Sequence, residues 1–258
     1  MSFISKQTLI DNKKTLGLAS IVALAFIIAL ALILRWAAKP DVPDFSQYPA
    51  GSERKEVFFS YFLSLVEERN RELSQTRQQL LAWRDQADSL SAGQKRDLIG
   101  LAGRYNINSF DPENQSHWDR LLRRVDRVPP SLALAQAANE SAWGTSRFSV
   151  EGHNYFGQWC FVKGCGMVPA RRDAGKIHEV EKFDSPRESV EAYIRNLNRH
   201  SAYQPLRDIR QQLRANDQPI TGMALAGGLS RYSERGDEYI KELRSMIRDN
   251  SLDEYDSQ

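Results

Sequence analysis

A single acidic residue, Glu140, stands near the end of a stretch of small and aliphatic residues that runs from Leu132 to Gly144 and reads LALAQAANESAWG. The composition predicts a short helix. Helical spacing places the Glu140 carboxyl on the face of Gln136 and Trp143, a partly apolar stripe with an aromatic neighbour. Burial there would favour the neutral carboxyl and raise its pKa, as a general acid near neutral pH requires. The alternative is a helix-end glutamate that faces solvent or accepts hydrogen bonds from backbone amides.

Two motifs make this hypothesis more specific. Residues 140–144 read ESAWG and residues 154–157 read NYFG. Together they resemble the E-S-x-W-G and N-[LIY]-F-G pattern of glycoside hydrolase family 73, bacterial β-N-acetylglucosaminidases with a lysozyme-like fold that cut peptidoglycan. The chain looks most like the Bax-type branch of that family, over about residues 43–250. Further resembling segments are PDF at 43–45, YPAG at 48–51, RVD at 124–126, KG at 163–164, ESV at 188–190, NLN at 196–198 and YS at 232–233.

The resemblance implies that Glu140 is the general acid that protonates the leaving glycosidic oxygen. Tyr232 and Tyr239, in RYSERGDEY, resemble the family's pair of tyrosines, of which the first faces the cleft. That phenol would bond the substrate N-acetyl group or orient the reacting sugar. Core packing is the alternative for Trp143 and Phe156. The residues expected to shape the helix end or line the sugar groove are Ser141, Trp143, Asn154, Tyr155, Phe156 and Tyr239.

A second carboxylate is harder to place. Most glycosidases flank the scissile bond with two acids. The candidates are Asp173, Glu179 and Glu181 in RRDAGKIHEVEKF, and strand alternation puts the last two on one face. We take Glu179 as the working hypothesis; a solvated hairpin edge is the alternative for each candidate. A mechanism with one acid, in which the substrate's own 2-acetamido group is the nucleophile, stays open.

Two other functions compete with the glucosaminidase hypothesis. A lytic transglycosylase shares the lysozyme-like fold and a single catalytic glutamate, but releases a 1,6-anhydro sugar. A catalytically silent cell-wall binding or scaffold protein is the rival from another class. Asn139 favours it, because an amide beside Glu140 would hydrogen-bond the carboxyl and lower its pKa.

The elements that position these residues are mainly helices. The sequence predicts a mostly α fold with a small β-hairpin lobe (α+β), and the resemblance implies a lysozyme-like catalytic domain. A helix over Ser52–Leu90 carries an apolar stripe, which we interpret as packing on its own domain rather than as a coiled-coil seam. Gly, Cys and aromatic residues between 152 and 184 predict the hairpin lobe. Further helices are expected from the Ser91 capping box to Arg104, at 118–125, from Pro130, and at 189–200, 206–215, 222–229 and 238–249.

Cys160 and Cys165 are the only cysteines and lie close together in WCFVKGCG. They are a poor zinc half-site, because no second cysteine pair exists and the four histidines are scattered. A loop-closing disulfide in an oxidising compartment is the better hypothesis. No phosphate-binding glycine loop, nucleophile elbow or metal motif is present, so no cofactor is expected.

Composition and one apolar block indicate where the protein acts. The chain has 258 residues and a formal net charge of +2, which disfavours a nucleic-acid partner. Its mean hydropathy of −0.53 excludes a polytopic membrane protein. The uncharged run Leu16–Leu34 spans roughly 28 Å as a helix, enough to cross a bilayer. Trp36 follows it, which favours an uncleaved anchor over a signal peptide.

These features predict an order of segments along the chain. The lysines before the span orient the N-terminus to the cytoplasm and export the remainder. We expect a single-pass inner-membrane protein with a periplasmic catalytic domain, peptidoglycan strands as substrate, and a possible envelope partner at helix 52–90. The expected segments are a cytoplasmic tail (1–15), the anchor (16–36), a Pro-rich tether (37–51), a helical region packed on the catalytic domain (52–127), the glucosaminidase domain (128–250) and a tail (251–258).

Overall fold

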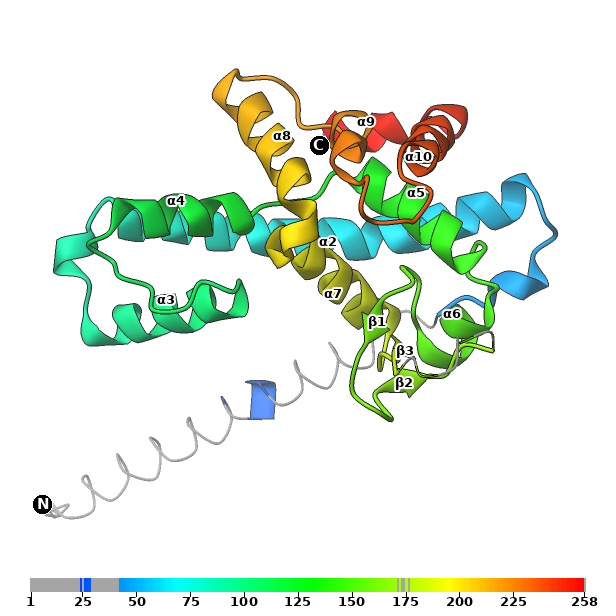
Figure 1. The fold of residues 1–258 in the computed structure, drawn as a ribbon, viewed down its shortest axis with the longest axis horizontal. Helices are drawn as coiled ribbons and strands as arrows, with labels where there is room; N and C mark the ends of the chain where they lie inside the picture. Colours follow the sequence, from blue (N-terminus) through cyan, green and yellow to red (C-terminus); the bar gives the residue numbers. More distant parts are fainter. Residues whose placement is uncertain are drawn as a thin grey trace, which may run out of the picture. The chain divides into compact units, whose positions relative to one another are not determined.

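The computed structural model describes residues 24, 26–28, 42–170, 172, 175 and 177–257. The chain divides into two units, Met1–Val42 and Pro43–Gln258, and the second holds the helices from α2 onward and the sheet (Figure 1). The expected anchor and cytoplasmic tail lie outside the described residues, apart from residues 24 and 26–28. Within the described part of the chain, no helix is both long and apolar enough to cross a bilayer.

The second unit is mostly helical and has one small sheet, which confirms the expected fold class at that level. Its α-helices are α2 (Ser52–Arg84), α3 (Ala92–Arg104), α4 (Gln115–Arg124), α5 (Pro130–Ser141), α6 (Arg147–Gly152), α7 (Pro186–Arg199), α8 (Gln204–Ala215), α9 (Gly222–Leu225) and α10 (Asp237–Asp249). Its 3-10 turns are η1 (Phe45–Gln47), η2 (Ala87–Ser89), η3 (Ser201–Tyr203), η4 (Ala226–Gly228) and η5 (Leu252–Ser257).

Helix α2 is the long axis of this unit (Figure 1). It contains no glycine or proline and buries one stripe, formed by Phe58, Phe59, Phe62, Val66, Asn70, Leu73 and Leu80. α4, α5 and α7 of the same chain pack against it. The stripe therefore serves the core of this chain, as its few heptads indicate. The helix ends at Arg84, earlier than the expected Leu90, and η2 follows.

Helices α3 and α4 fold back along one end of α2 (Figure 1). The predicted capping box starts α3: Ser91 Oγ accepts from the Gln94 amide at 3.3 Å, and Gln94 Oε1 accepts from the Ser91 amide at 2.8 Å. Asn114 caps α4 in a similar way, through its side chain and the Ser116 amide. We call α3, α4 and the end of α2 that they cover the arm.

Helix α5 lies at the centre of the core. Pro130 occupies its first turn, as predicted, and residues 131–138 are all buried. A helix that is buried all round must be covered on every side, and α2, α9, α10 and η5 cover this one. The element that carries Glu140 is therefore fixed by its neighbours along almost its whole length.

The β lobe is a three-stranded antiparallel sheet in the order β1-β3-β2, made of β1 (Trp159–Cys160), β2 (Gly166–Met167) and β3 (Glu179–Glu181). Cys160 and Cys165 are joined by a disulfide that closes the β1–β2 loop. β3 is the central strand, so the expectation of a solvated hairpin edge at Glu179 is wrong. Glu179 is 4% exposed, because its two carboxylate oxygens accept hydrogen bonds from the Gly164 and Gly166 amides at 3.0 and 2.9 Å.

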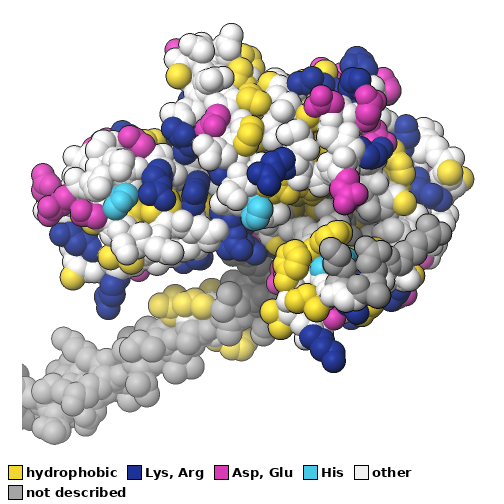
Figure 2. Space-filling model, viewed as in Figure 1, with side chains coloured by type: hydrophobic (Ala, Val, Ile, Leu, Met, Phe, Trp, Pro, Cys, Tyr) yellow, Lys and Arg dark blue, Asp and Glu magenta, His cyan; other side chains and the backbone are white. Residues whose placement is uncertain are grey.

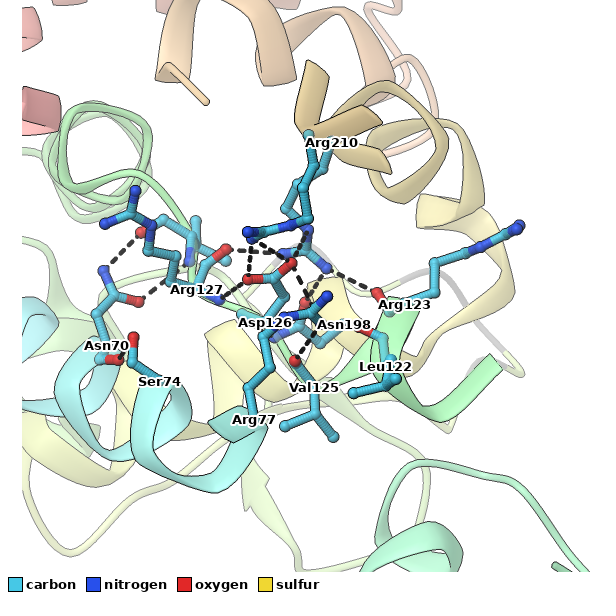
Figure 3. Close-up of polar contacts among 12 residues, drawn as sticks. Asn70, Ser74, Arg77, Leu122, Arg123, Val125, Asp126, Arg127, Asn198 and Arg210 are labelled. Atoms are coloured by element: carbon cyan, nitrogen blue, oxygen red, sulfur yellow. Dashed lines mark hydrogen bonds and ion pairs between the residues drawn. The ribbon is translucent and has the colours of Figure 1, made fainter. Parts of the chain in front are cut away.

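A buried acid joins the helices around α5 (Figure 3). Asp126, 5% exposed, accepts hydrogen bonds from Arg214 at 2.8 Å to each oxygen, and pairs with Arg77 and Arg210 at 3.6 Å. Arg210 also donates to the carbonyls of Arg123 and Arg127, at the C-terminal end of α4. This arginine clamp (Arg77, Asp126, Arg210 and Arg214) ties α2 and α8 to the segment that leads into α5.

Candidate active site

Glu140 is the next-to-last residue of α5, where the helix stops abruptly. Ala142, Trp143 and Gly144 have φ angles of 51°, 60° and 77°, so three successive residues adopt the left-handed region and turn the chain away. A Cβ at position 144 would lie 2.3 Å from the Phe45 ring, so this turn requires glycine. The turn leaves the carboxyl at the open end of an otherwise enclosed helix.

The two oxygens of Glu140 have different surroundings. Oε1 accepts a hydrogen bond from the Tyr239 hydroxyl at 2.7 Å and a long one from Asn139 Nδ2 at 3.5 Å. Oε2 has no hydrogen-bond partner among the described residues and faces Gly157, where an added Cβ would lie 3.4 Å away. One oxygen is therefore anchored, and the other is open toward a residue without a side chain.

The pKa of Glu140 is raised, chiefly because burial disfavours the carboxylate. The hydrogen bonds from Tyr239 and Asn139 lower it, but burial outweighs both. The Asn139 contact that we expected is thus present without reversing the shift. The negative end of the α5 dipole acts in the same direction as burial. A partly buried carboxyl with a raised pKa suits proton donation.

A buried chain of hydrogen bonds continues from Glu140 into the core. Tyr239 donates to Glu140 and accepts from Gln136 Nε2 at 3.0 Å. Gln136 Oε1 in turn accepts from the Tyr193 hydroxyl at 2.7 Å. Gln136, Tyr193 and Tyr239 are at most 1% exposed. Every donor in this relay (Tyr193, Gln136, Tyr239) points toward Glu140, so the relay fixes the phenol as donor and the carboxyl as acceptor.

The two tyrosines of RYSERGDEY lie differently with respect to the acid. Tyr239, and not Tyr232, contacts the acid. Tyr232 stacks on the Tyr239 ring, with centroids 5.6 Å apart and an interplanar angle of 3°, and donates to the Phe156 carbonyl at 2.8 Å. Tyr232 is half-buried and links the NYFG loop to the tyrosine that holds Glu140.

Ser141 and Trp143 shape the helix end, as the resemblance implies. Ser141 Oγ donates to the Ala137 carbonyl at 2.6 Å and accepts from the Gly144 amide at 2.8 Å. The Trp143 ring packs against Phe58 and Phe59 of α2, with centroids 5.9 and 5.2 Å apart. Both residues therefore hold the turn against α2.

The expectation that Asn154, Tyr155 and Phe156 line a sugar groove is wrong in this structure. They are 1%, 2% and 1% exposed, because each is committed to the protein. Asn154 Nδ2 donates to the carbonyls of Gln158 and Glu181, which ties the loop to β3. Tyr155 packs on α2, and Phe156 stacks on Tyr193 at 4.0 Å between centroids. The loop positions Gly157 beside Glu140.

Comparison with known proteins agrees with these features. The family model described as glucosaminidase, mannosyl-glycoprotein endo-beta-N-acetylglucosaminidase, matches residues 115–252. "Protein bax" of Escherichia coli (strain K12) is 34% identical over 214 residues, which cover 83% of this chain and 76% of the relative. The chain belongs to the glucosaminidase family. The match includes Glu140 and every residue of the relay, whereas α2 and α3 precede it.

A solved structure is also similar to this chain. The catalytic domain of the autolysin Auto from Listeria monocytogenes has a TM-score of 0.41 and 19% sequence identity. The alignment covers 88% of this chain and 96% of that one.

The acidic side chains of the β lobe have different interactions from those of Glu140. The backbone amides bound by Glu179 lower its pKa, and they leave the carboxylate committed to the loop between the strands. Burial raises the pKa of Glu181, which lies near Arg195 and Arg199 of α7. Neither glutamate contributes to the pKa shift of Glu140. Asp173 lies outside the described residues.

Sequence reasoning missed three features of the candidate site. These are the partner role of Gln136, the participation of Tyr193, and the open side of Glu140 at Gly157. Gln136 carried a signal, because it precedes the acid by one helical turn. Tyr193 carried none, since its contact with Gln136 spans 57 residues of sequence.

Proposed function

We propose that this protein is a peptidoglycan hydrolase that cleaves β-1,4 bonds of N-acetylglucosamine, with Glu140 as the general acid of a lysozyme-like catalytic domain. The observation that carries the proposal is the Glu140 carboxyl, which has a raised pKa, one oxygen anchored by Tyr239 and the other open at Gly157. Membership of the glucosaminidase family supports the sugar.

In the proposed reaction, Oε2 of Glu140 gives its proton to the leaving glycosidic oxygen as the bond to the anomeric carbon breaks. The carboxylate that forms keeps its hydrogen bond from Tyr239, which becomes charge-assisted and stronger. Because Gln136 donates to the Tyr239 oxygen, the phenol hydrogen stays directed at Glu140 throughout. Water then completes hydrolysis, and Glu140 recovers a proton.

For the nucleophile we favour the substrate's 2-acetamido group. Glu179 is bound to backbone amides, and Glu181 is half-buried in the field of Arg195 and Arg199. Attack by the acetamido oxygen would give a product with retained anomeric configuration. Inversion in the first-formed product, observed by NMR, would instead require a second protein carboxylate and a water on the opposite face.

The location of the protein is proposed from its sequence. We propose that residues 16–36 anchor the chain in the inner membrane and that the unit from residue 43 onward works in the periplasm, on wall strands. The cysteine pair fits an oxidising compartment, because it is closed into a disulfide. An envelope partner at helix 52–90 would have to use the surface of α2 that the core leaves free, since its apolar stripe is buried.

Clearance of purified sacculi by Glu140→Gln tests the general acid. The amide keeps the shape of the side chain and can still accept from Tyr239, but it has no proton of suitable acidity to give. We expect the clearance rate to fall about 10²–10⁴-fold. Equal clearance by the variant and the wild type would reject Glu140 as the acid, and no clearance by either would favour the silent binding protein.

A further inference from the structure

A cavity of about 500 Å³ lies in the arm, between α2, α3 and α7. Three arginines line it: Arg69 from α2, Arg104 from the end of α3 and Arg195 from α7. Asp97 is the one acid among its described lining residues. We call this cavity the arginine pocket. On the face drawn in Figure 2, basic side chains lie over the arm together with acidic ones.

The pocket has more hydrogen-bond donors than acceptors. Arg69 pairs with Glu72 at 2.8 Å, but its Nε is buried and has no partner among the described residues. The guanidinium groups of Arg104 and Arg195 form no hydrogen bond or ion pair with any described residue. Arg69 and Arg195 are half-buried, whereas Arg104 is exposed at the rim. Buried donors without acceptors, such as Arg69 Nε, are costly unless a ligand or water satisfies them. The pocket therefore suits a ligand that brings acceptors and negative charge.

Tyr105 lines the pocket together with these arginines. The residue is 3% exposed, and its hydroxyl has no hydrogen-bond partner in the part of the chain that the structure describes. Burial raises the pKa of this hydroxyl, and the positive charges of Arg69, Arg195 and Arg104 oppose the rise. Three arginines from three helices thus line the same pocket as one unpartnered phenol, which is a suitable arrangement for binding a carboxylate.

The other residues that line the pocket indicate which further groups a ligand would carry. Leu73, Leu101 and the Trp83 ring form an apolar side, and Gln75, Thr76 and Gln79 offer amides and a hydroxyl. This volume is in the range of small-ligand sites, about 300–1,000 Å³. A short peptide with methyl-sized side chains and a free carboxylate matches both walls.

Helix α7 connects the pocket with the candidate active site. Tyr193, in the relay, and Arg195, in the pocket, are two residues apart on this helix, so they point to nearly opposite sides. We propose that the arginine pocket binds a carboxylate of a short acidic peptide, the stem peptide carried by the glycan that this enzyme cuts. The binding of an acidic peptide is inferred from the pocket itself. Only the identification of that peptide as the stem peptide of the glycan rests on the proposed function.

Isothermal titration calorimetry of the full-length chain with the dipeptide L-alanyl-D-glutamate tests this site. We expect one binding event that weakens as salt is added, because the attraction is electrostatic. The matched ligand is the same dipeptide with both carboxyl groups amidated, which should bind at least about tenfold more weakly. Equal binding of the acid and the amide, or no binding of either, would overturn the proposal.

Variants assign the binding to the pocket. Arg195→Gln should weaken binding about tenfold or more, and Tyr105→Phe should weaken it several-fold while keeping the ring. Asp97→Asn removes the one acid of the pocket lining and should tighten binding, a gain that misfolding does not produce. Arg96→Gln, an exposed change on α3 outside the pocket, is the control and should bind as the wild type does. Wild-type affinity in Arg195→Gln and Asp97→Asn would place the peptide elsewhere.

The titration needs no catalysis, so its failure is distinct from failure of the proposed function. If the chain binds the dipeptide but clears no sacculi, the peptide-binding proposal stands and the hydrolase proposal fails. If the chain clears sacculi but does not bind the dipeptide, the hydrolase proposal stands and the peptide-binding proposal fails.

Discussion

At Glu140, burial and hydrogen bonding act on one carboxyl in opposite directions. Burial raises its pKa, while the bonds from Tyr239 and Asn139 lower it, and burial prevails. Folding therefore favours the neutral acid. This helps catalysis, because a general acid must hold its proton until the glycosidic oxygen takes it. The same burial lowers the free energy of unfolding when the solution pH is high enough to ionise Glu140.

Glu140→Gln should be more stable than the wild type at alkaline pH and equally stable at acidic pH. The pKa of Glu140 is higher in the folded than in the unfolded chain, so the wild type is fully stable below the unfolded pKa. It loses stability as the pH rises through the folded pKa. Thermal melting from pH 4 to 9 measures the difference. Glu56→Gln, an exposed change on α2, is the control; a Glu140→Gln difference that is independent of pH would contradict the shift.

Tyr239→Phe should move the alkaline limb of the activity profile to higher pH. The lost hydrogen bond stabilises the Glu140 carboxylate, so its removal raises the pKa of Glu140 and keeps the acid protonated further up the pH scale. The maximal rate should fall, because the carboxyl loses its anchor. Rates of sacculus clearance at several pH values check both effects. Tyr61→Phe on α2 is the matched control, and an unmoved limb in Tyr239→Phe would reject the role of Tyr239.

Sequence reasoning reached Glu140 because the relevant pattern is local. The acid, its apolar face and Trp143 lie within one short helix and its end. Tyr239 is 99 residues from its partner, so the resemblance identified the residue but not its role. Asn154, Tyr155 and Phe156 were placed in a groove because the resemblance to glycoside hydrolase family 73 implies that place for the NYFG segment. Their actual burial depends on α2 and α7, which no local pattern reveals.

At the scale of elements, the relay joins three helices. Gln136 belongs to α5, Tyr193 to α7 and Tyr239 to α10, and each is buried. Polar groups in a core fix one arrangement of the surrounding helices, because any shift leaves a donor or acceptor unpaired. The relay thus positions the Glu140 carboxyl together with the helices around it.

Gln136→Met should lower the free energy of unfolding by about 1–3 kcal/mol, because Tyr193 and Tyr239 lose a buried partner. It should also lower kcat more than it changes KM, since Tyr239 is then free to turn its hydrogen away from Glu140. Denaturant unfolding and steady-state kinetics measure the two effects. Adding Tyr193→Phe removes the unpaired hydroxyl, so the double variant should recover part of the stability. Full additivity of the two substitutions would contradict the relay.

Asp126→Asn should be strongly destabilising, because it leaves the clamp arginines without a buried counter-charge. We expect a loss of about 3–5 kcal/mol in the free energy of unfolding. Asp208→Asn is the matched control, because it breaks the exposed pair with Arg123 at 3.2 Å and should cost less than about 1 kcal/mol. Similar effects of the two substitutions would contradict the role of the clamp.

Several elements could be predicted from their own residues. The Ser91 capping box and the first-turn proline at 130 are local signals, and both helices begin where expected. Helix α6 was missed, because it is short and its cap, Ser146, lies in a polar segment without apolar periodicity. The central place of β3 was missed as well. Strand order depends on how the disulfide loop and the Glu179 carboxylate fold back on the sheet, and alternation alone does not determine it.

At the scale of the molecule, the near-neutral charge of +2 combines an uncharged apolar run with a unit in which acids and bases are interspersed. The clamp, the relay and the arginine pocket are all made by α2 or α7 together with neighbouring helices. Helix α2 precedes the family match, yet it supplies the rings on which Trp143 and Tyr155 rest. The N-terminal helices are therefore part of the machinery that supports the site.

The most direct test of the central claim is digestion of purified sacculi with identification of the new chain ends by mass spectrometry. We expect the wild type to release fragments with N-acetylglucosamine at a hydrolysed reducing end, and Glu140→Gln to release essentially none. Fragments that end in 1,6-anhydromuramic acid would show a lytic transglycosylase instead, and they would contradict the glucosaminidase account.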